Sequence, residues 1–149
     1  MQQDHLDQNP EQQIRALITD WKLAVEAKNI LGITALYAPN IVAYDAILQL
    51  QFIGVDAYRE HWQRCMEHCS GGSGWVKLTQ LIVEANEQLA FSHALAEFGG
   101  TDDQGSTQSC WMRVTQCWRK IDGQWRVVHE HFSVPFDMVS GAALCSLQP

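Results

Sequence analysis

Two histidines and a serine occupy alternate positions near the end of the chain, as His129, His131 and Ser133, with Glu130 and Phe132 between them. Side chains alternate between the two faces of a strand, so the three polar residues would share one face. Imidazoles can bind a metal ion or move a proton near neutral pH. A carboxylate among apolar neighbours can serve as a base. One face of this strand could therefore bind a metal ion or move a proton through its histidines, and the other face could supply a carboxylate base.

Metal binding is the weaker of these interpretations. His129 and His131 are an incomplete ligand set, for which His93 or Asp45 would have to supply a third ligand. The stretch "CMEHC" (residues 65–69) places two cysteines on one helix face, but no second pair follows at a similar short spacing. We expect no metal. We expect reduced thiols, because the five cysteines are an odd number and no secretory signal accompanies them.

The elements expected to carry these residues are three helices followed by long strands. Apolar residues recur every three or four positions from Pro10 to about Lys28, with Asn9 as a cap. A short helix is expected over Ile30–Tyr37, then a strand over "IVAYDA" and a helix over "GVDAYREHWQRCMEHC", ended by "SGGSG". The expected strands are "WVKLTQLIVEA", "QLAFSHALAEFGG", "SCWMRVTQCWRKI" and "QWRVVHEHFSVPF". This order predicts an α+β fold, a curved antiparallel sheet with helices on one face.

The length of the turn at Asp122-Gly123 decides which residues of the last two strands share a face. In a two-residue turn Ile121 pairs with Gln124, and both histidines of the last strand lie beside Gln116. In a three-residue turn with a glycine bulge, Lys120 pairs with Gln124 instead, and the histidines move to the opposite face.

We favour the bulged turn, because it makes one face mostly apolar, as a pocket wall should be. That face would carry Gln116, Val128, Glu130 and Phe132. The opposite face would suit a homodimer interface, since aromatic residues are enriched there. Its residues would be Trp111, Arg113, Trp125, His129 and His131.

Three stretches together resemble the nuclear transport factor 2-like superfamily: "ALYAPNIVAYD", "GxDAYxxxW" (residues 54–62) and "DGQWRVVHEHFSVP". The resemblance is closest to its SnoaL-like members and to the association domain of calcium/calmodulin-dependent kinase II. It covers about Pro10 to Pro135 and implies a cone-shaped α+β barrel with three N-terminal helices and a pocket inside. The superfamily includes isomerases, dehydratases, polyketide cyclases, ligand carriers and assembly domains, so the fold does not determine the chemistry.

The steroid isomerase branch of that superfamily offers a comparison by position. Its catalytic aspartate corresponds to Asp45, its oxyanion-hole tyrosine to Trp21 and its protonated aspartate to Gln116, so one position of three matches in kind. The kinase association domain carries pocket arginines at positions that are here Leu95, Gln116 and Phe132. The resemblance therefore does not imply a pocket that binds carboxylates strongly.

We expect a pocket for a small, mainly apolar or aromatic ligand. If the protein is catalytic, we expect isomerisation, dehydration or cyclisation without a cofactor. The candidate catalytic residues are Asp45, Glu130 and His93. The candidate ligand-binding residues are Trp21, Tyr58, Trp62, Gln116, Val128 and Phe132. The alternative is a non-enzymatic oligomerisation or ligand-binding module, built through the histidine face.

Bulk properties narrow the remaining classes. The net charge of -7 and the absence of a basic run argue against a nucleic-acid partner. No apolar stretch approaches the roughly 20 residues that span a membrane, and the first residues are not a secretory signal, so we expect a cytoplasmic protein. We expect one domain over residues 10–137, a disordered tail over residues 1–9 and a second tail over residues 138–149.

Overall fold

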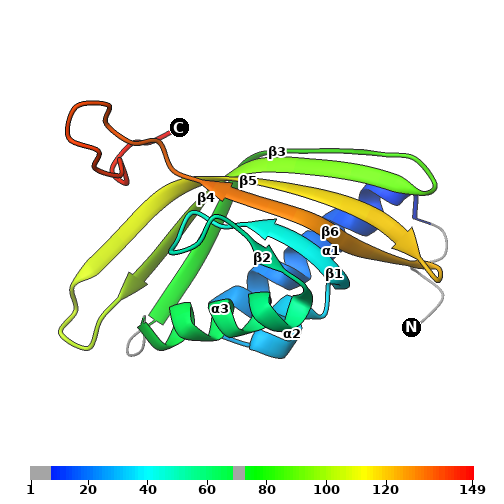
Figure 1. The fold of residues 1–149 in the computed structure, drawn as a ribbon, viewed down its shortest axis with the longest axis horizontal. Coiled ribbons are helices and arrows are strands. Elements are labelled where there is room, and N and C mark those ends of the chain that lie inside the picture. Colours follow the sequence, from blue (N-terminus) through cyan, green and yellow to red (C-terminus); the bar gives the residue numbers. More distant parts are fainter. Residues whose placement is uncertain (1–7, 69–72) are drawn as a thin grey trace.

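The computed structural model describes residues 8–68 and 73–149. The elements are α1 (Pro10–Glu26), α2 (Ile30–Thr34), β1 (Tyr37–Tyr44), β2 (Phe52–Ile53), α3 (Val55–His68), β3 (Ser73–Ala85), β4 (Leu89–Thr101), β5 (Thr107–Ile121) and β6 (Gln124–Ser133). The three helices lie against one face of a curled, six-stranded sheet (Figure 1). The α+β class, with its helices ahead of the long strands, is confirmed. Most of the tail predicted to be disordered, residues 1–7, lies outside the described residues, as do residues 69–72.

Helix α1 begins at Pro10, directly after Asn9, which forms a capping box with Gln12. The Asn9 side chain accepts a hydrogen bond from the Gln12 backbone N–H at 2.9 Å, and the Gln12 side chain accepts one from the Asn9 N–H at 3.1 Å. Pro10 occupies the first helical position, where its missing N–H costs nothing. The helix then buries Ile14, Ile18, Trp21, Ala24 and Val25 at spacings of three and four residues. This stripe aims Trp21 into the core.

Helix α2 is shorter than predicted. It ends at Thr34, and the chain is already extended at Tyr37, where the expected helix was to finish. A residue that precedes proline is disfavoured in the helical region, so Ala38 before Pro39 favours an early strand. As a consequence, the Tyr37 ring is buried beneath the sheet.

The strand order is β2-β1-β6-β5-β4-β3. The four long strands β3 to β6 form successive antiparallel pairs, as predicted. Strand β1 instead runs parallel to β6 and aligns Ala43 with Glu130 and Tyr44 with His131. The end of β1 is thereby placed next to the middle of β6, which brings Asp45 close to Glu130.

The turn between β5 and β6 is not the three-residue turn that we favoured. Ile121 pairs with Gln124, and Asp122 and Gly123 have φ angles of 51° and 78°. Two successive positive φ angles are typical of a two-residue type I′ turn, whose twist matches that of the flanking strands. The preferred turn was therefore wrong.

A bulge farther along β6 restores the predicted faces beyond it. Trp118 pairs with Val127 but Cys117 pairs with His129, so Val128 is the extra residue. Beyond this bulge, Gln116 faces inward with Glu130 and Phe132, and the two histidines face outward, as predicted. Before it the assignment was wrong: Trp125 is buried on the helix-facing side and not on the outer face.

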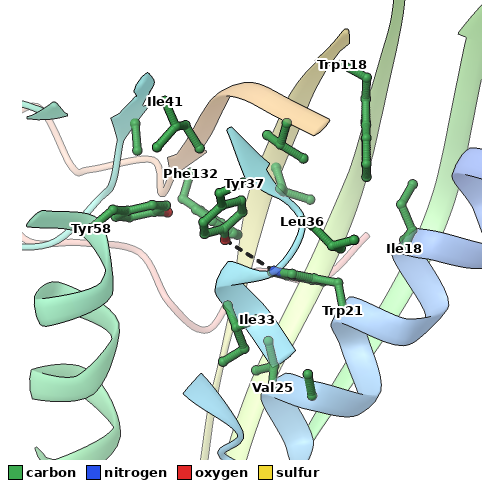
Figure 2. Packing of buried hydrophobic residues seen from close by; sticks show 14 of the residues in the cluster. Ile18, Trp21, Val25, Ile33, Leu36, Tyr37, Ile41, Tyr58, Trp118 and Phe132 are labelled. Carbon is green, nitrogen blue, oxygen red and sulfur yellow. Dashed lines mark hydrogen bonds between the residues drawn. The ribbon is translucent and has the colours of Figure 1, made fainter. Parts of the chain in front are cut away.

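The core lies between the three helices and the inner face of the sheet (Figure 2). Trp21 stacks on Phe132 with ring centroids 6.2 Å apart, and Tyr37 stacks on Tyr58 at 5.2 Å. Trp62 meets Trp21 edge to face at 6.2 Å. Such aromatic pairs stabilise a core beyond the area that they bury. No helix within the described residues is long and apolar enough to cross a membrane.

Candidate functional site

Glu130 is a fully buried carboxylate at the centre of the core. Its Oε2 atom accepts hydrogen bonds from the Tyr37 hydroxyl at 2.7 Å and the Tyr58 hydroxyl at 2.6 Å. Its Oε1 atom accepts one from the Gln116 amide at 2.7 Å. Three short bonds offset part of the large cost of removing a carboxylate from water. The side chains come from β1, α3 and two neighbouring strands of the sheet, so only the folded chain brings them together.

A second layer of polar side chains orients the first. The Trp21 indole N–H donates to the Tyr37 hydroxyl at 3.2 Å (Figure 2). On the other side, the Trp118 indole donates to the Ser92 hydroxyl at 3.1 Å. That hydroxyl donates to the Gln116 amide oxygen at 3.4 Å, which leaves the amide N–H₂ group directed at Glu130. The cluster is thus held from both sides of the core.

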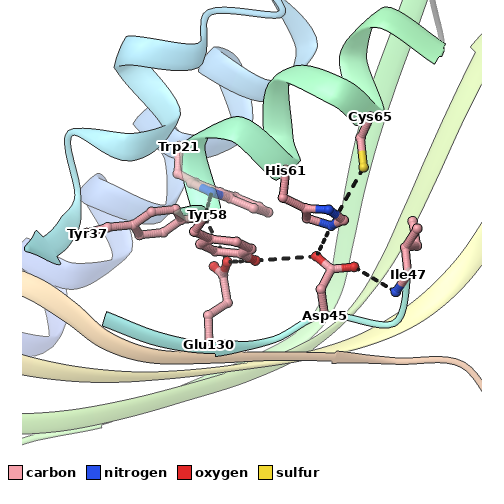
Figure 3. A network of polar contacts seen from close by, with 8 residues as sticks. All are labelled: Trp21, Tyr37, Asp45, Ile47, Tyr58, His61, Cys65 and Glu130. Atoms are coloured by element: carbon pink, nitrogen blue, oxygen red, sulfur yellow. Dashed lines mark hydrogen bonds and ion pairs between the residues drawn. The ribbon is translucent and has the colours of Figure 1, made fainter. Parts of the chain in front are cut away.

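Asp45 connects this cluster to the surface (Figure 3). It follows β1 directly, and its Oδ2 atom lies 3.4 Å from the Tyr58 hydroxyl and 3.4 Å from the His61 Nε2 atom. Its Oδ1 atom accepts the Ile47 backbone N–H at 3.1 Å. The side chain is 10% exposed, whereas that of His61 is 2% exposed. A hydrogen-bonded path therefore runs from the protein surface at Asp45, through Tyr58, to Glu130.

Burial is the largest influence on the pKa values of Glu130 and of the two tyrosines that donate to it. Burial raises the pKa of Glu130 to about 7, although the Tyr58, Gln116 and Tyr37 donors oppose the increase. Burial and the Glu130 charge raise the pKa of Tyr37 and that of Tyr58 well above 10.0, so both stay protonated. Glu130 can therefore gain or lose a proton near neutral pH, which is unusual for a carboxylate and typical of functional sites.

His61 carries a positive charge beside Asp45, where the hydrogen-bonded path reaches the surface. Burial alone would lower the pKa of His61, but the Asp45 carboxylate and the Cys65 sulfur raise it to about 9. The Cys65 sulfur lies 3.7 Å from the same Nε2 atom that faces Asp45. The other ring nitrogen, Nδ1, is buried without a hydrogen-bond partner among the described residues, as is the Trp62 indole nitrogen. His61 therefore places a positive charge 3.4 Å from the Asp45 carboxylate.

An open hollow of about 790 Å³ lies beside Asp45. Its lining combines apolar and polar side chains: Tyr44, Asp45, Ala46, Leu48, Gln49, Leu50, Gln51 and His131. Inside the cone, by contrast, the space near Trp21 and Gln116 amounts to about 10 Å³, which is no more than one water molecule needs. Aromatic side chains therefore fill the interior, and the larger hollows lie outside it: the one beside Asp45, and one of about 420 Å³ on the outer face beside Ile82, His93 and Arg113.

The structure brings together most of the predicted site residues. Glu130, Asp45, Tyr58, Gln116 and Trp21 belong to one hydrogen-bonded cluster. Trp62 and Phe132 pack against Trp21 in the aromatic core beside it.

Two predicted site residues lie elsewhere. His93 is exposed on the outer face, where its ring stacks on Phe91 at 6.3 Å, because its strand position has the opposite parity to the buried Ser92 and Ala94. Val128 is the half-buried extra residue of the β6 bulge and belongs to neither alternating face.

Two residues of the cluster were missing from the prediction. Tyr37 was taken as the end of a helix, so its burial in β1 was not expected. His61 was expected only to pack in the core. The spacing of Tyr58, His61 and Trp62 by three and four residues was the signal available for His61, since it places all three on one helix face.

The outer histidines have structural partners. The His129 Nδ1–H group donates to the Val42 carbonyl oxygen at 2.6 Å, and its ring meets Tyr44 edge to face at 4.7 Å. His131 is exposed, and its ring meets Tyr44 edge to face at 5.6 Å. Within residues 8–68 and 73–149, no three His, Cys, Asp or Glu side chains could hold a metal ion together. Of the cysteines in "CMEHC", Cys69 lies outside these residues.

Comparisons with known proteins agree on the fold. The family model of the SnoaL-like domain matches residues 14–137. A nuclear transport factor 2-like protein of unknown function from Pseudomonas putida is 47% identical, over 93% of this chain and 96% of that chain, with a TM-score of 0.86. No curated protein matches the chain.

More distant structures share the fold alone. A proposed calcium/calmodulin dependent protein kinase II association domain from Xanthomonas campestris is 18% identical, over 93% of this chain and 91% of that chain, with a TM-score of 0.72. A proposed dehydratase of the nuclear transport factor 2-like family from Streptomyces avermitilis is 14% identical, over 82% of this chain and 93% of that chain, with a TM-score of 0.71.

Proposed function

The chain belongs to the SnoaL-like domain family of the nuclear transport factor 2-like superfamily, and from this premise we propose that it is an enzyme that moves a proton on a small, mainly apolar ligand without a cofactor. Asp45 is the proposed general base. The observation that carries the proposal is the position of Asp45, which lines the open hollow and also contacts the buried Tyr58 and His61 side chains. A base must reach both its substrate and the groups that set its charge.

The proposed ligand site is the hollow over residues 44–51. Leu48 and Leu50 are 74% and 95% exposed, and together with Tyr44 they offer an apolar surface to a ligand. Gln49, Gln51 and His131 supply hydrogen-bonding groups around it, as small-molecule sites require. A ligand of this kind would be apolar with one or two polar groups, in keeping with the prediction from sequence.

The proposed chemistry begins with removal of a proton from carbon next to a carbonyl group. Asp45 is the group that accepts this proton, and the positively charged His61 ring lies 3.4 Å from its carboxylate. Tyr58 lies between Asp45 and Glu130, at 3.4 Å and 2.6 Å, so a proton taken up at Asp45 could be relayed to Glu130. Glu130 would then serve as a proton store and not as a group that touches the substrate.

The reaction class follows from this single step. Isomerisation, dehydration and cyclisation of carbonyl compounds can each begin with such a proton transfer. The Streptomyces avermitilis relative is named as a proposed dehydratase of the same fold. That name supports the class of small-molecule lyase or isomerase as a proposal for this chain.

Proton exchange tests the proposal without knowledge of the product. The protein would be incubated in D₂O with a panel of cyclic and aromatic ketones, and loss of the α-proton signals would be followed by NMR. We expect exchange with at least one compound, and loss of that exchange in Asp45→Asn. The control is Asp20→Asn, which changes an exposed aspartate on α1. Exchange that survives in Asp45→Asn would exclude Asp45 as the base.

A second candidate function is an assembly module without catalysis. The observation that favours it is the interior of the cone, which side chains fill almost completely. In that case the outer face of the sheet would matter most, and we propose a second copy of the chain as its partner. Absence of proton exchange across the panel, together with a stable dimer in solution, would favour this function over the enzyme.

A further inference from the structure

The segment after β6 folds back on itself. Phe136 and Ala143 form an isolated antiparallel bridge, and the Leu144 N–H donates to the Pro135 carbonyl at 2.8 Å. The Asp137 N–H donates to the carbonyl of residue 142 at 2.9 Å, which closes the same small loop. These hydrogen bonds run within the segment. They return the chain to the end of β6, so Cys145 follows directly after a residue that is bonded to Pro135.

Cys110 of β5 lies beside the end of β6 to which this segment returns. Arg113 pairs with Ser133, the last residue of β6, and Cys110 lies three residues before Arg113 on β5. The Cys110 thiol donates to the Trp111 carbonyl oxygen at 3.8 Å, and the Cys145 sulfur lies close enough to raise the pKa of the Cys110 thiol. Cys110 is half-buried and Cys145 is exposed, and both are free thiols. Two cysteines 35 positions apart in sequence thus meet at one place.

We propose that Cys110 and Cys145 form an oxidation site, at which a small disulfide such as oxidised glutathione links the C-terminal segment covalently to β5. This inference does not depend on the proposed function. The remaining described cysteines are differently placed: Cys65 lies on α3 against His61, and Cys117 faces outward between Phe91 and His129.

The reaction is two successive thiol–disulfide exchanges. The Cys145 thiolate attacks one sulfur of the small disulfide, forms a mixed disulfide and releases one small thiol. Cys110 then gives up its proton to solvent and attacks the Cys145 sulfur, which forms the Cys110–Cys145 bond and releases the second small thiol. The protein dithiol is oxidised, and the small disulfide is reduced to two thiols.

The environments of the two sulfurs determine which thiol reacts first. Cys145 is exposed and can reach a small disulfide in solvent. Burial and the neighbouring Cys145 sulfur raise the pKa of Cys110 to about 12, so Cys110 is a poor first nucleophile. Once Cys145 is in a mixed disulfide, it no longer carries a negative charge beside Cys110. The attack of Cys110 is then intramolecular and directed at the nearest sulfur.

The bond would restrain a segment with large exposed apolar side chains. Phe136, Met138 and Val139 are 67%, 91% and 95% exposed. A covalent link at Cys145 would hold these side chains near the end of the sheet. We therefore expect slower amide hydrogen exchange over residues 136–145 in the oxidised protein than in the reduced protein.

The experiment equilibrates the full-length protein with mixtures of reduced and oxidised glutathione, traps free thiols and maps disulfides by mass spectrometry of unreduced peptides. We expect a Cys110–Cys145 linked peptide and an intact mass that has lost two hydrogens. Cys145→Ser should lose the link. Cys110→Ser should instead accumulate glutathione on Cys145, because no second thiol resolves the adduct.

The matched controls are Cys65→Ser and Cys117→Ser, which remove other half-buried thiols and should leave the link unchanged. Three results would overturn the proposal: a principal link that involves Cys65, Cys69 or Cys117, a bond between Cys145 residues of two molecules, or wild-type protein that stops at the mixed disulfide as Cys110→Ser does. The unreduced peptides of these species differ in mass, so the peptide map separates them.

Discussion

At the scale of the residue, Glu130 is the most unusual side chain of this protein. A carboxylate with no exposed surface is costly to bury, and the chain directs three donors from Tyr37, Tyr58 and Gln116 at it. The glutamate nevertheless holds protons more tightly when folded than when unfolded, because burial outweighs the donors. Folding stability must therefore depend on pH through this residue.

The first prediction concerns that dependence. The pKa of Glu130 is about 7 in the folded protein and near the ordinary 4.5 when unfolded, so the folded state binds more protons between these values. The free energy of unfolding should fall by about 3 kcal/mol as the pH rises through this window. Glu130→Gln should flatten the curve there, as measured by urea unfolding at a series of pH values.

His61 extends the fall in the free energy of unfolding to higher pH and provides a control for the Glu130 prediction. Its pKa is raised from 6.5 to about 9, so its contribution to stability is complete below about 6.5 and is lost as the pH rises through 9. Glu130→Gln should leave this upper part of the curve in place. A glutamine variant with an unchanged slope between 4.5 and 7 would mean that Glu130 stays ionised throughout.

The second prediction separates the two tyrosines that donate to Glu130. Tyr37→Phe and Tyr58→Phe each remove one buried hydrogen bond to the carboxylate and should each cost about 1–3 kcal/mol in the free energy of unfolding. Only Tyr58 also contacts Asp45. If the proton path operates, Tyr58→Phe should slow α-proton exchange far more than Tyr37→Phe, although both lose similar stability. Equal loss of exchange would indicate a purely structural network.

At the scale of the element, the β5–β6 hairpin decides what faces the core. Its two-residue turn fixes the pairing near the tip, and the bulge at Val128 shifts the alternation by one residue. Trp125 and Val127 therefore face inward before the bulge, and Glu130 and Phe132 do so after it. A hairpin without the bulge would turn Glu130 outward and bring both histidines of β6 inward.

The third prediction tests the turn itself. Asp122 and Gly123 both have positive φ angles, at 51° and 78°, and the latter is strained for any residue with a Cβ atom. Gly123→Ala should cost about 1 kcal/mol in urea unfolding. Asp122→Asn should be neutral or slightly stabilising, since asparagine adopts such angles more readily. A neutral Gly123→Ala variant would contradict the two-residue turn.

At the scale of the whole molecule, the helices cover one face of the sheet and leave the other open (Figure 1). The strand registers align Tyr44, His131, Thr115, His93 and Ile82 in one row across this outer face. Aromatic and aliphatic side chains surrounded by hydrogen-bonding groups are typical of interfaces between identical subunits. We propose a homodimer through this face, with Trp111, Arg113, His129 and His131 among its contacts and without the buried Trp125.

The fourth prediction follows from that proposal. Ile82 and Phe91 are 45% and 43% exposed on the outer face, so Ile82→Glu and Phe91→Glu would place charges within the interface. Sedimentation velocity should show a dimer for the wild-type protein and a monomer for both variants. The control is Leu31→Glu, which changes a 73% exposed apolar residue on α2 and should remain dimeric. A wild-type monomer, or dimers that tolerate both charges, would exclude this interface.

The sequence alone determined the fold class, the helices and long strands, and the chemical types in the cluster, because periodicity and turn residues are local signals. Asp45 and Gln116 were identified as candidates from positions that the family resemblance assigns, Tyr58 from its place on the third helix, and Glu130 as the costly carboxylate of an apolar face. The early strand at Tyr37 has a local cause, because Pro39 disfavours a helical conformation at Ala38. Two features required the tertiary structure: the bulge at Val128 and the side of the sheet that His93 occupies. Each depends on parity, which a shift of one residue reverses for every side chain that follows. Local patterns therefore determine which groups the protein has, whereas strand register determines which of them meet.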